Sequence, residues 1–170
     1  MKRIAEFQKV SLPVFSACCG ESSLIGSDGQ VLEAYKSIRL PRRATTGSAG
    51  YDFFLPFAAE LPPGGSLSVP TGIRVRIDAG WVLMIFPKSG LGFRYRLQLD
   101  NTVGIVDQDY YGAENEGHII IRITNDSKSD TMVSLERGKA FAQGIFVEYG
   151  IAAGDETKGT RTGGFGSTGV

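Results

Sequence analysis

The sequence predicts a single all-β domain, folded as a barrel or a jelly roll. Three observations lead to this prediction. The 23 glycines and 7 prolines are scattered along the 170 residues, as expected where many short strands need many turns. Several segments alternate between apolar and polar residues or are rich in β-branched and aromatic ones, which favours strands. Candidate helices are few, and the chain has no internal repeat and no linker.

The clearest strand signal is the segment "SLSVPTGIRVRID" at 66–78, whose alternation places Ile73, Val75 and Ile77 on one face. The turn "DAG" then leads into "WVLMIF", a nearly continuous apolar run that predicts a buried strand. Similar signals predict two more strands, "GHIIIRITN" (117–125) and "AFAQGIFVEY" (140–149), and two turns, "PPGG" (62–65) and "NDSKSD" (125–130).

Helical structure is expected only as a turn or two, at "EAYKSI" (33–38) and in the stretch after Ser89. The region around "CCGESSLIGSDGQ" (18–30) is interpreted as a long hairpin or an inserted loop. We therefore divide the chain into one β domain over 1–158, whose N-terminal part at 1–40 carries this possible insertion, and a glycine-rich arm over 159–170.

Composition narrows the class of protein. The net charge is zero, without the basic excess of a nucleic-acid binder, but residues 1–99 are basic and residues 100–170 are acidic. Two such patches could serve an anionic ligand together with a cation, or could be two solvated faces. Cys18 and Cys19 are adjacent and cannot form a disulfide across the fold, which indicates a reducing compartment. No signal peptide or membrane span is evident, so a soluble, cytoplasmic or otherwise intracellular protein without membrane partners is expected.

The segment "DNTVGIVDQDYYG" (100–112) is the most unusual one. Asp107 and Asp109 are two residues apart, so they would share one face of an extended strand. Such a pair could be a general base or a metal-binding carboxylate, or simply a surface pair. Tyr110 beside them offers a flat apolar surface of the size of a sugar ring.

Other polar residues fit a phosphate site. In "FPKSGLGFRYR" (86–96), a cation, a hydroxyl and glycine backbone N–H groups follow a buried strand, which is what phosphate oxygens need. Asp52 stands at a strand start, and Gln143 lies inside an apolar run, where it needs a hydrogen-bond partner. The tail "GGFGSTGV" (163–170) is either frayed or a lid that orders on binding.

Five segments in this order resemble the motifs of the trimeric deoxyuridine triphosphatases, or dUTPases. The match runs from about Leu40 to the C-terminus: "GSAGYDF", "PKSGLG", "DNTVGIVDQDYYG", "GKAFAQGIF" and "GGFGSTG". The resemblance implies a jelly-roll-like β-barrel of the dUTPase type, assembled as a homotrimer with active sites at subunit boundaries. It implies hydrolysis of dUTP to dUMP and pyrophosphate with Mg²⁺, which keeps uracil out of DNA and supplies dUMP for thymidylate synthesis.

The resemblance also implies roles for individual residues. Asp107 matches the carboxylate that activates the water attacking the α-phosphorus. Asp52 matches the residue that reaches Mg²⁺ through water, and Tyr110 matches the ring that packs under deoxyribose and excludes a ribose hydroxyl. The matching uracil-reading hairpin contains Asn101, Gly104, Ile105 and Val106. The matching phosphate- and water-holding groups are Lys88, Ser89, Gly90 and Gln143.

The C-terminal arm of this family closes over the nucleotide, and the glycines keep it mobile when the site is empty. Phe165 would stack on uracil, Gly166 would expose backbone donors, and Ser167 and Thr168 would add hydroxyl contacts. Arg161 matches the phosphate-binding arginine, although it lies one residue nearer the paired glycines than is usual.

The sequence departs from the family pattern at several positions. Lys88 and Ala140 stand where arginines are common, which removes a bidentate fork and a cation, and "GAENE" (112–116) resembles an insertion. These departures keep an alternative open, a dUTPase-fold nucleotide-binding or regulatory protein with weakened catalysis. A dCTP deaminase is disfavoured because "HIIIRITN" lacks the glutamate that this chemistry needs. His118 is the single histidine and is interpreted as structural, so neither a histidine cluster nor a Ser-His-Asp triad is expected.

Overall fold

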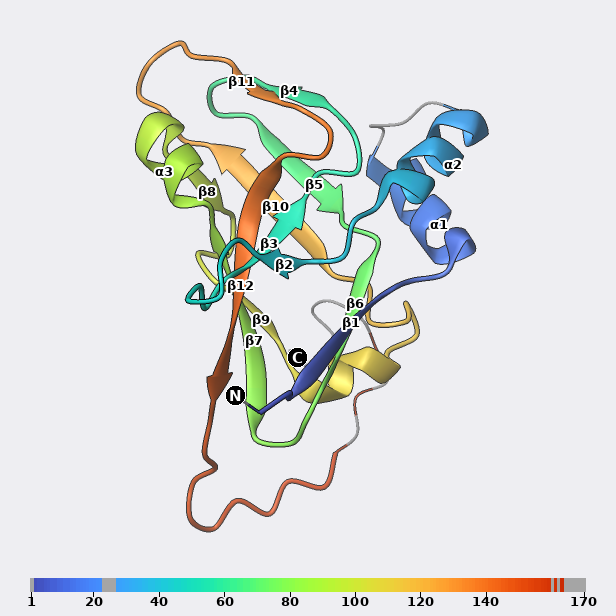
Figure 1. Ribbon diagram of the computed structural model, residues 1–170, viewed down its shortest axis with the longest axis vertical. Helices are drawn as coiled ribbons and strands as arrows, with labels where there is room; N and C mark the ends of the chain where they lie inside the picture. Colours follow the sequence, from blue (N-terminus) through green and yellow to red (C-terminus); the bar gives the residue numbers. More distant parts are fainter. Residues whose placement is uncertain (1, 23–26, 160, 162, 164–170) are drawn as a thin grey trace.

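A computed structural model of the chain describes residues 2–22, 27–159, 161 and 163 (Figure 1). Strand pairs in this part of the chain are antiparallel and form a jelly-roll-like barrel. The larger sheets have the strand orders β2-β3-β12-β7-β9 and β5-β10-β8, and the pairs β1-β6 and β11-β4 complete the barrel. The elements are β1 (Ala5–Lys9), α1 (Leu12–Ser22), α2 (Asp28–Ser37), β2 (Arg42–Arg43), β3 (Tyr51–Phe54), β4 (Ala59–Leu61), β5 (Ser66–Pro70), β6 (Ile73–Ile77), β7 (Trp81–Pro87), α3 (Ser89–Tyr95), β8 (Leu97–Leu99), β9 (Gly104–Val106), the 3-10 helix η1 (Gln108–Gly112), β10 (Ile120–Asn125), β11 (Val133–Leu135) and β12 (Ala140–Glu148).

The strand predictions are confirmed. The alternating segment forms β5 and β6, and its three predicted inward residues are 2–3% exposed. The apolar run forms β7, which pairs with β12 over a longer register than β3 does. The other two predicted strands are β10 and β12. The core between the sheets contains Phe53, Leu83, Ile123 and Phe141, each at most 1% exposed. Burying side chains of this size stabilises the fold by about 1.5–3 kcal/mol each.

The expected helical turns are also present, as part of α2 and as α3. The interpretation of 18–30 as a hairpin or a loop is wrong for the described residues, because α1 and α2 occupy most of this region and lie side by side (Figure 1). In α1, Phe15 and Cys19 lie four apart and are both fully buried. This helical spacing is hard to recognise among neighbours such as Gly20, which has low helix propensity.

The N-terminal part of the chain is held against the barrel at two places. Phe7 of β1 packs on Phe53 and Phe146, with ring centroids 5.9 and 5.7 Å away. Phe15 of α1 then packs against the rings of Tyr35 and His118. Ser27 caps the N-terminus of helix α2, because its side chain accepts a hydrogen bond from the backbone N–H of Gln30. Strand β1 and the helices are therefore integral to the fold rather than appended to it.

Candidate active site

The β8–β9 segment, residues 97–106, borders a cavity of about 310 Å³. Its two strands do not pair with each other as a hairpin would, because β8 pairs with β10 and β9 pairs with β7. Asn101, Gly104 and Val106, three of the predicted nucleotide-binding residues, line this cavity. Gly104 lets the backbone lie close against β7, because a Cβ at this position would stand only 3.2 Å from the Cβ of Ile85. The fourth predicted hairpin residue, Ile105, is half exposed on β9. The walls are mostly isoleucine, leucine and valine with a few polar groups, a composition typical of ligand pockets.

Asp107 comes directly after β9, and Asp109 lies in η1. The prediction that the two carboxylates share a face of an extended strand is wrong, because the chain turns into the 3-10 helix at Asp107. The two side chains nevertheless bind the same group. Arg161 donates from Nη2 to Asp107 Oδ2 at 2.7 Å and from Nε to Asp109 Oδ1 at 2.9 Å. The Arg161 side chain is only 12% exposed in this position.

Tyr110 projects from η1 into the protein and is 4% exposed. Its hydroxyl donates a hydrogen bond to the carbonyl of His118 at 2.8 Å and accepts one from Asn115 at 2.9 Å. Burial raises the pKa of this hydroxyl above its ordinary value, although the bond from Asn115 and the charge of Arg161 act in the opposite direction. The guanidinium of Arg161 lies 5.6 Å from the centre of the Tyr110 ring. Asp107, Asp109, Tyr110 and Arg161 therefore form one cluster.

A second cluster lies at the end of β7. Lys88 follows this strand, and its ammonium group donates to Asp52 Oδ1 of β3 at 2.8 Å. Gln143 of β12 stands beside Asp52 in the strand register, and its amide donates to the carbonyl of Pro87 at 3.3 Å. The partner that the sequence required for Gln143 is thus a backbone carbonyl. Ser89 and Gly90 begin α3 next to this cluster and are exposed.

The two clusters lie at opposite ends of the β7–β9 pair. Val106 of β9 pairs with Leu83, so Asp107 lies next to the start of β7, whereas Lys88 follows its last residue. At roughly 3.3 Å per residue, the five steps from Leu83 to Lys88 span about 16 Å. Asp107 is displaced further in the opposite direction.

Four predicted arm residues, Phe165, Gly166, Ser167 and Thr168, lie outside the described residues. Sequence reasoning noted "GAENE" only as an insertion and assigned no role to its residues. Asn115 contacts Tyr110 from this segment. The one signal that could have indicated a role for Asn115 is its position shortly after the segment 100–112, which contains Asp107 and Tyr110.

Among residues 2–22, 27–159, 161 and 163, no group of three or more His, Cys, Asp or Glu side chains could hold a metal ion. Nor does any helix in this part of the chain have the length and apolar character needed to cross a membrane.

Fold and site together define a class of protein, a jelly-roll-like β-barrel with an apolar cavity beside β9 and an acidic cluster directly after this strand. Comparisons with known proteins specify the family: the dUTPase family model matches residues 36–169. The deoxyuridine 5'-triphosphate nucleotidohydrolase of Lactococcus lactis is 39% identical over 83% of this chain and 96% of its own. That of Paraburkholderia phytofirmans is 37% identical over 84% and 97%. The chain belongs to the dUTPase family.

Solved structures show the same fold. The crystal structure of dUTPase from Streptococcus mutans superposes with a TM-score of 0.65, at 30% identity over 87% of this chain and 98% of that one. The dUTPase of Staphylococcus bacteriophage 80alpha with dUPNHPP gives a TM-score of 0.64 over 99% and 100% of the two chains. At 20% identity, this second likeness supports the fold alone.

Proposed function

We propose that this enzyme, a dUTP diphosphatase by family, hydrolyses dUTP to dUMP and pyrophosphate by water attack on the α-phosphorus. The observation that carries the proposal is the position of Asp107, directly after β9, a strand that borders an apolar cavity. A base read by the β8–β9 segment would leave its sugar and α-phosphate near the carboxylate. Positioning of this kind supplies much of the rate enhancement in phosphoryl transfer.

Asp107 is the general base in this proposal. Arg161 holds one carboxylate oxygen, Oδ2, and so fixes the orientation of the group. We assign the other oxygen, Oδ1, to the attacking water, whose proton it accepts as the bond to phosphorus forms and the bond to the pyrophosphate oxygen breaks. Tyr110 packs under deoxyribose, and Asn101 with the backbone of Gly104, Ile105 and Val106 reads uracil.

Lys88, Ser89, Gly90 and Gln143 hold the phosphates and water in this proposal. The Lys88 ammonium is well suited because it is oriented by Asp52 at 2.8 Å. The arm residues Arg161, Phe165, Gly166, Ser167 and Thr168 close over the bound nucleotide.

Asp52 is the residue that we assign to Mg²⁺, through water. A single carboxylate fits this ion, because Mg²⁺ usually keeps several waters and binds one or two carboxylates together with substrate phosphates. When bound, Mg²⁺ neutralises phosphate charge and so eases the approach of a nucleophile. Asp52 already accepts a hydrogen bond from Lys88, which holds its carboxylate in one orientation.

We further propose a homotrimer with shared active sites. The support is the separation of about 16 Å or more between the base Asp107 and the phosphate-binding Lys88 along one β7–β9 pair, estimated from the strand rise. One triphosphate must contact the base at its α-phosphorus and the phosphate-binding groups nearby. Groups at opposite ends of a strand pair meet this requirement when each site combines the β8–β9 segment of one subunit with the β7 end of another.

Release of pyrophosphate from dUTP, dCTP, dTTP and UTP with Mg²⁺ tests the proposed function. We expect turnover of dUTP alone. Asp107→Asn should lower kcat by about 10²–10⁴-fold, the usual contribution of a general base. Asp109→Asn, an equally isosteric change two residues away, should retain activity within about tenfold, the scale of one charge-assisted contact. Tight binding of dUTP without turnover would instead favour the regulatory alternative.

A further inference from the structure

The loop that follows η1 contacts both the active site and the residue directly before helix α1. Asn115 donates its amide to the Tyr110 hydroxyl at 2.9 Å, and its Oδ1 accepts the backbone N–H of Gly117 at 3.1 Å. The Tyr110 hydroxyl in turn donates to the carbonyl of His118 at 2.8 Å. One side chain therefore links the loop backbone to the ring, and the ring is held at its hydroxyl from two directions.

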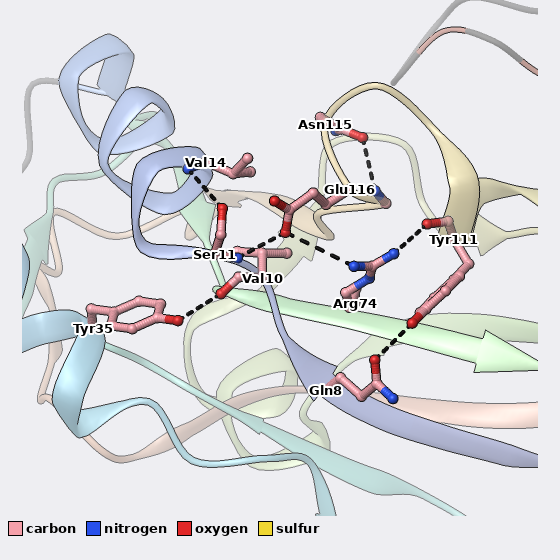
Figure 2. Close-up of polar contacts among 10 residues, drawn as sticks. Gln8, Val10, Ser11, Val14, Tyr35, Arg74, Tyr111, Asn115 and Glu116 are labelled. Atoms are coloured by element: carbon pink, nitrogen blue, oxygen red, sulfur yellow. Dashed lines mark hydrogen bonds and ion pairs between the residues drawn. The ribbon is translucent and has the colours of Figure 1, made fainter.

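Glu116 anchors the same loop to helix α1 (Figure 2). Its Oε2 accepts the backbone N–H of Ser11 at 2.8 Å, at the point where the helix begins, and lies 3.9 Å from Arg74 Nη1. Hydrogen bonds from Ser11, with a smaller effect of Arg74, lower the pKa of the Glu116 carboxyl. Glu116 has a φ of +58°, a conformation that is unfavourable for a residue with a side chain and that these contacts offset.

Arg74 extends the anchor to η1 itself, as Figure 2 shows. It donates from Nη2 to the carbonyl of Tyr111 at 2.7 Å and lies 3.8 Å from the centre of the Tyr111 ring. The Tyr111 hydroxyl donates to Gln8 Oε1 at 2.8 Å. Consecutive tyrosines of η1 are thus fixed by different partners, Tyr110 by Asn115 and Tyr111 by Arg74.

We propose that Asn115 and Glu116 are positioning residues that set the sugar specificity of this enzyme, by holding the Tyr110 ring where a ribose 2′-hydroxyl would collide with it. The inference rests on the proposed function, in which Tyr110 packs under deoxyribose. A ring free to shift by a fraction of an ångström would admit the extra hydroxyl, so discrimination depends on the hydrogen bonds at the far end of the ring. Glu116 contributes because it fixes the loop that presents Asn115.

The first test compares kcat/KM for dUTP and UTP in Asn115→Ala and Glu116→Ala. Loss of one hydrogen bond should reduce the dUTP:UTP preference by roughly fivefold to tenfold, chiefly through better use of UTP. Glu116→Gln, which keeps an acceptor for Ser11, should recover most of the preference. Glu114→Ala removes the same charge from an exposed position in the same loop and should leave the preference unchanged. A merely structural role would lower both activities together, and an unchanged ratio in Asn115→Ala would overturn the proposal.

A second measurement does not depend on activity. Amide hydrogen exchange of residues 107–112, without nucleotide, should be roughly fivefold faster in Asn115→Ala than in Glu114→Ala, since one stabilising hydrogen bond is lost. Asn115→Asp removes the donor without changing side-chain volume and serves if the alanine variant does not fold. Equal exchange in the variant and the control would refute the positioning role even if dUTP is turned over. Faster exchange in an enzyme inactive on dUTP would contradict the proposed function alone.

Discussion

Protonation of His118 should couple the stability of the protein to pH. The imidazole is 1% exposed, and its Nε2 accepts the backbone N–H of Gly72 at 2.9 Å. Burial lowers the pKa of His118 from 6.5 to about 4, with a small opposing effect of Glu116. Two features favour the neutral imidazole: the ring is buried, and its Nε2 must be unprotonated to accept the hydrogen bond from Gly72.

The sign and the size of the effect follow from this difference. Between pH 6.5 and about 4 the unfolded chain binds a proton that the folded protein does not, so the free energy of unfolding falls as the pH falls. At about 1.4 kcal/mol per pKa unit, the full loss is about 3 kcal/mol, and about 2 kcal/mol is lost by pH 5. The pKa of the Glu116 carboxyl lies below its ordinary value of 4.5, so this group adds a separate loss as the pH falls below about 4.5, outside the interval from pH 7 to pH 5.

Denaturant unfolding at pH 7, 6 and 5 measures this coupling. The wild-type protein should lose about 2 kcal/mol of unfolding free energy between pH 7 and pH 5. His118→Gln, which keeps an acceptor near the position of Nε2 but cannot titrate, should show a nearly flat dependence over this interval despite lower stability overall. A flat profile for the wild type, or an equal slope in the variant, would refute the reasoning.

Other substitutions test individual contacts. Gly117→Ala would place a Cβ 2.5 Å from the carbonyl oxygen of Tyr110, whereas Gly154 has a similar φ and open space around it. Thermal unfolding should therefore show a loss for Gly117→Ala that exceeds the roughly 1 kcal/mol expected for Gly154→Ala at a positive φ. Lys88→Gln should raise KM for dUTP by about tenfold or more, since a charged donor is lost. Lys88→Arg keeps the charge, so its KM should stay near the wild-type value. Equal KM in all three proteins would exclude Lys88 from phosphate binding.

Regular periodicity explains why much of the barrel could be predicted from the sequence. Ile73, Val75 and Ile77 alternate with charged residues, and burial of one face leaves a single register possible. Helix α1 could not be predicted because Phe15 and Cys19, the fully buried residues among its described side chains, are separated by small residues that favour no particular structure. Local patterns are informative only where a whole face is apolar.

The candidate site divides in the same way. Asp107 and Lys88 could be identified because they belong to contiguous motifs. Their separation along β7 and β9 could not, since it depends on the pairing of Val106 with Leu83. The contact of Glu116 with Ser11 joins residues 105 positions apart, a distance over which one sequence contains no signal. Contacts of this kind arise only when the barrel brings distant segments together.

Hydrolysis of dUTP in ¹⁸O-labelled water tests the central claim most directly. If Asp107 activates a water that attacks the α-phosphorus, mass spectrometry should find a single ¹⁸O in dUMP and none in pyrophosphate. Label in pyrophosphate would place the attack on the β-phosphorus, and absence of both products would contradict the enzymatic function itself.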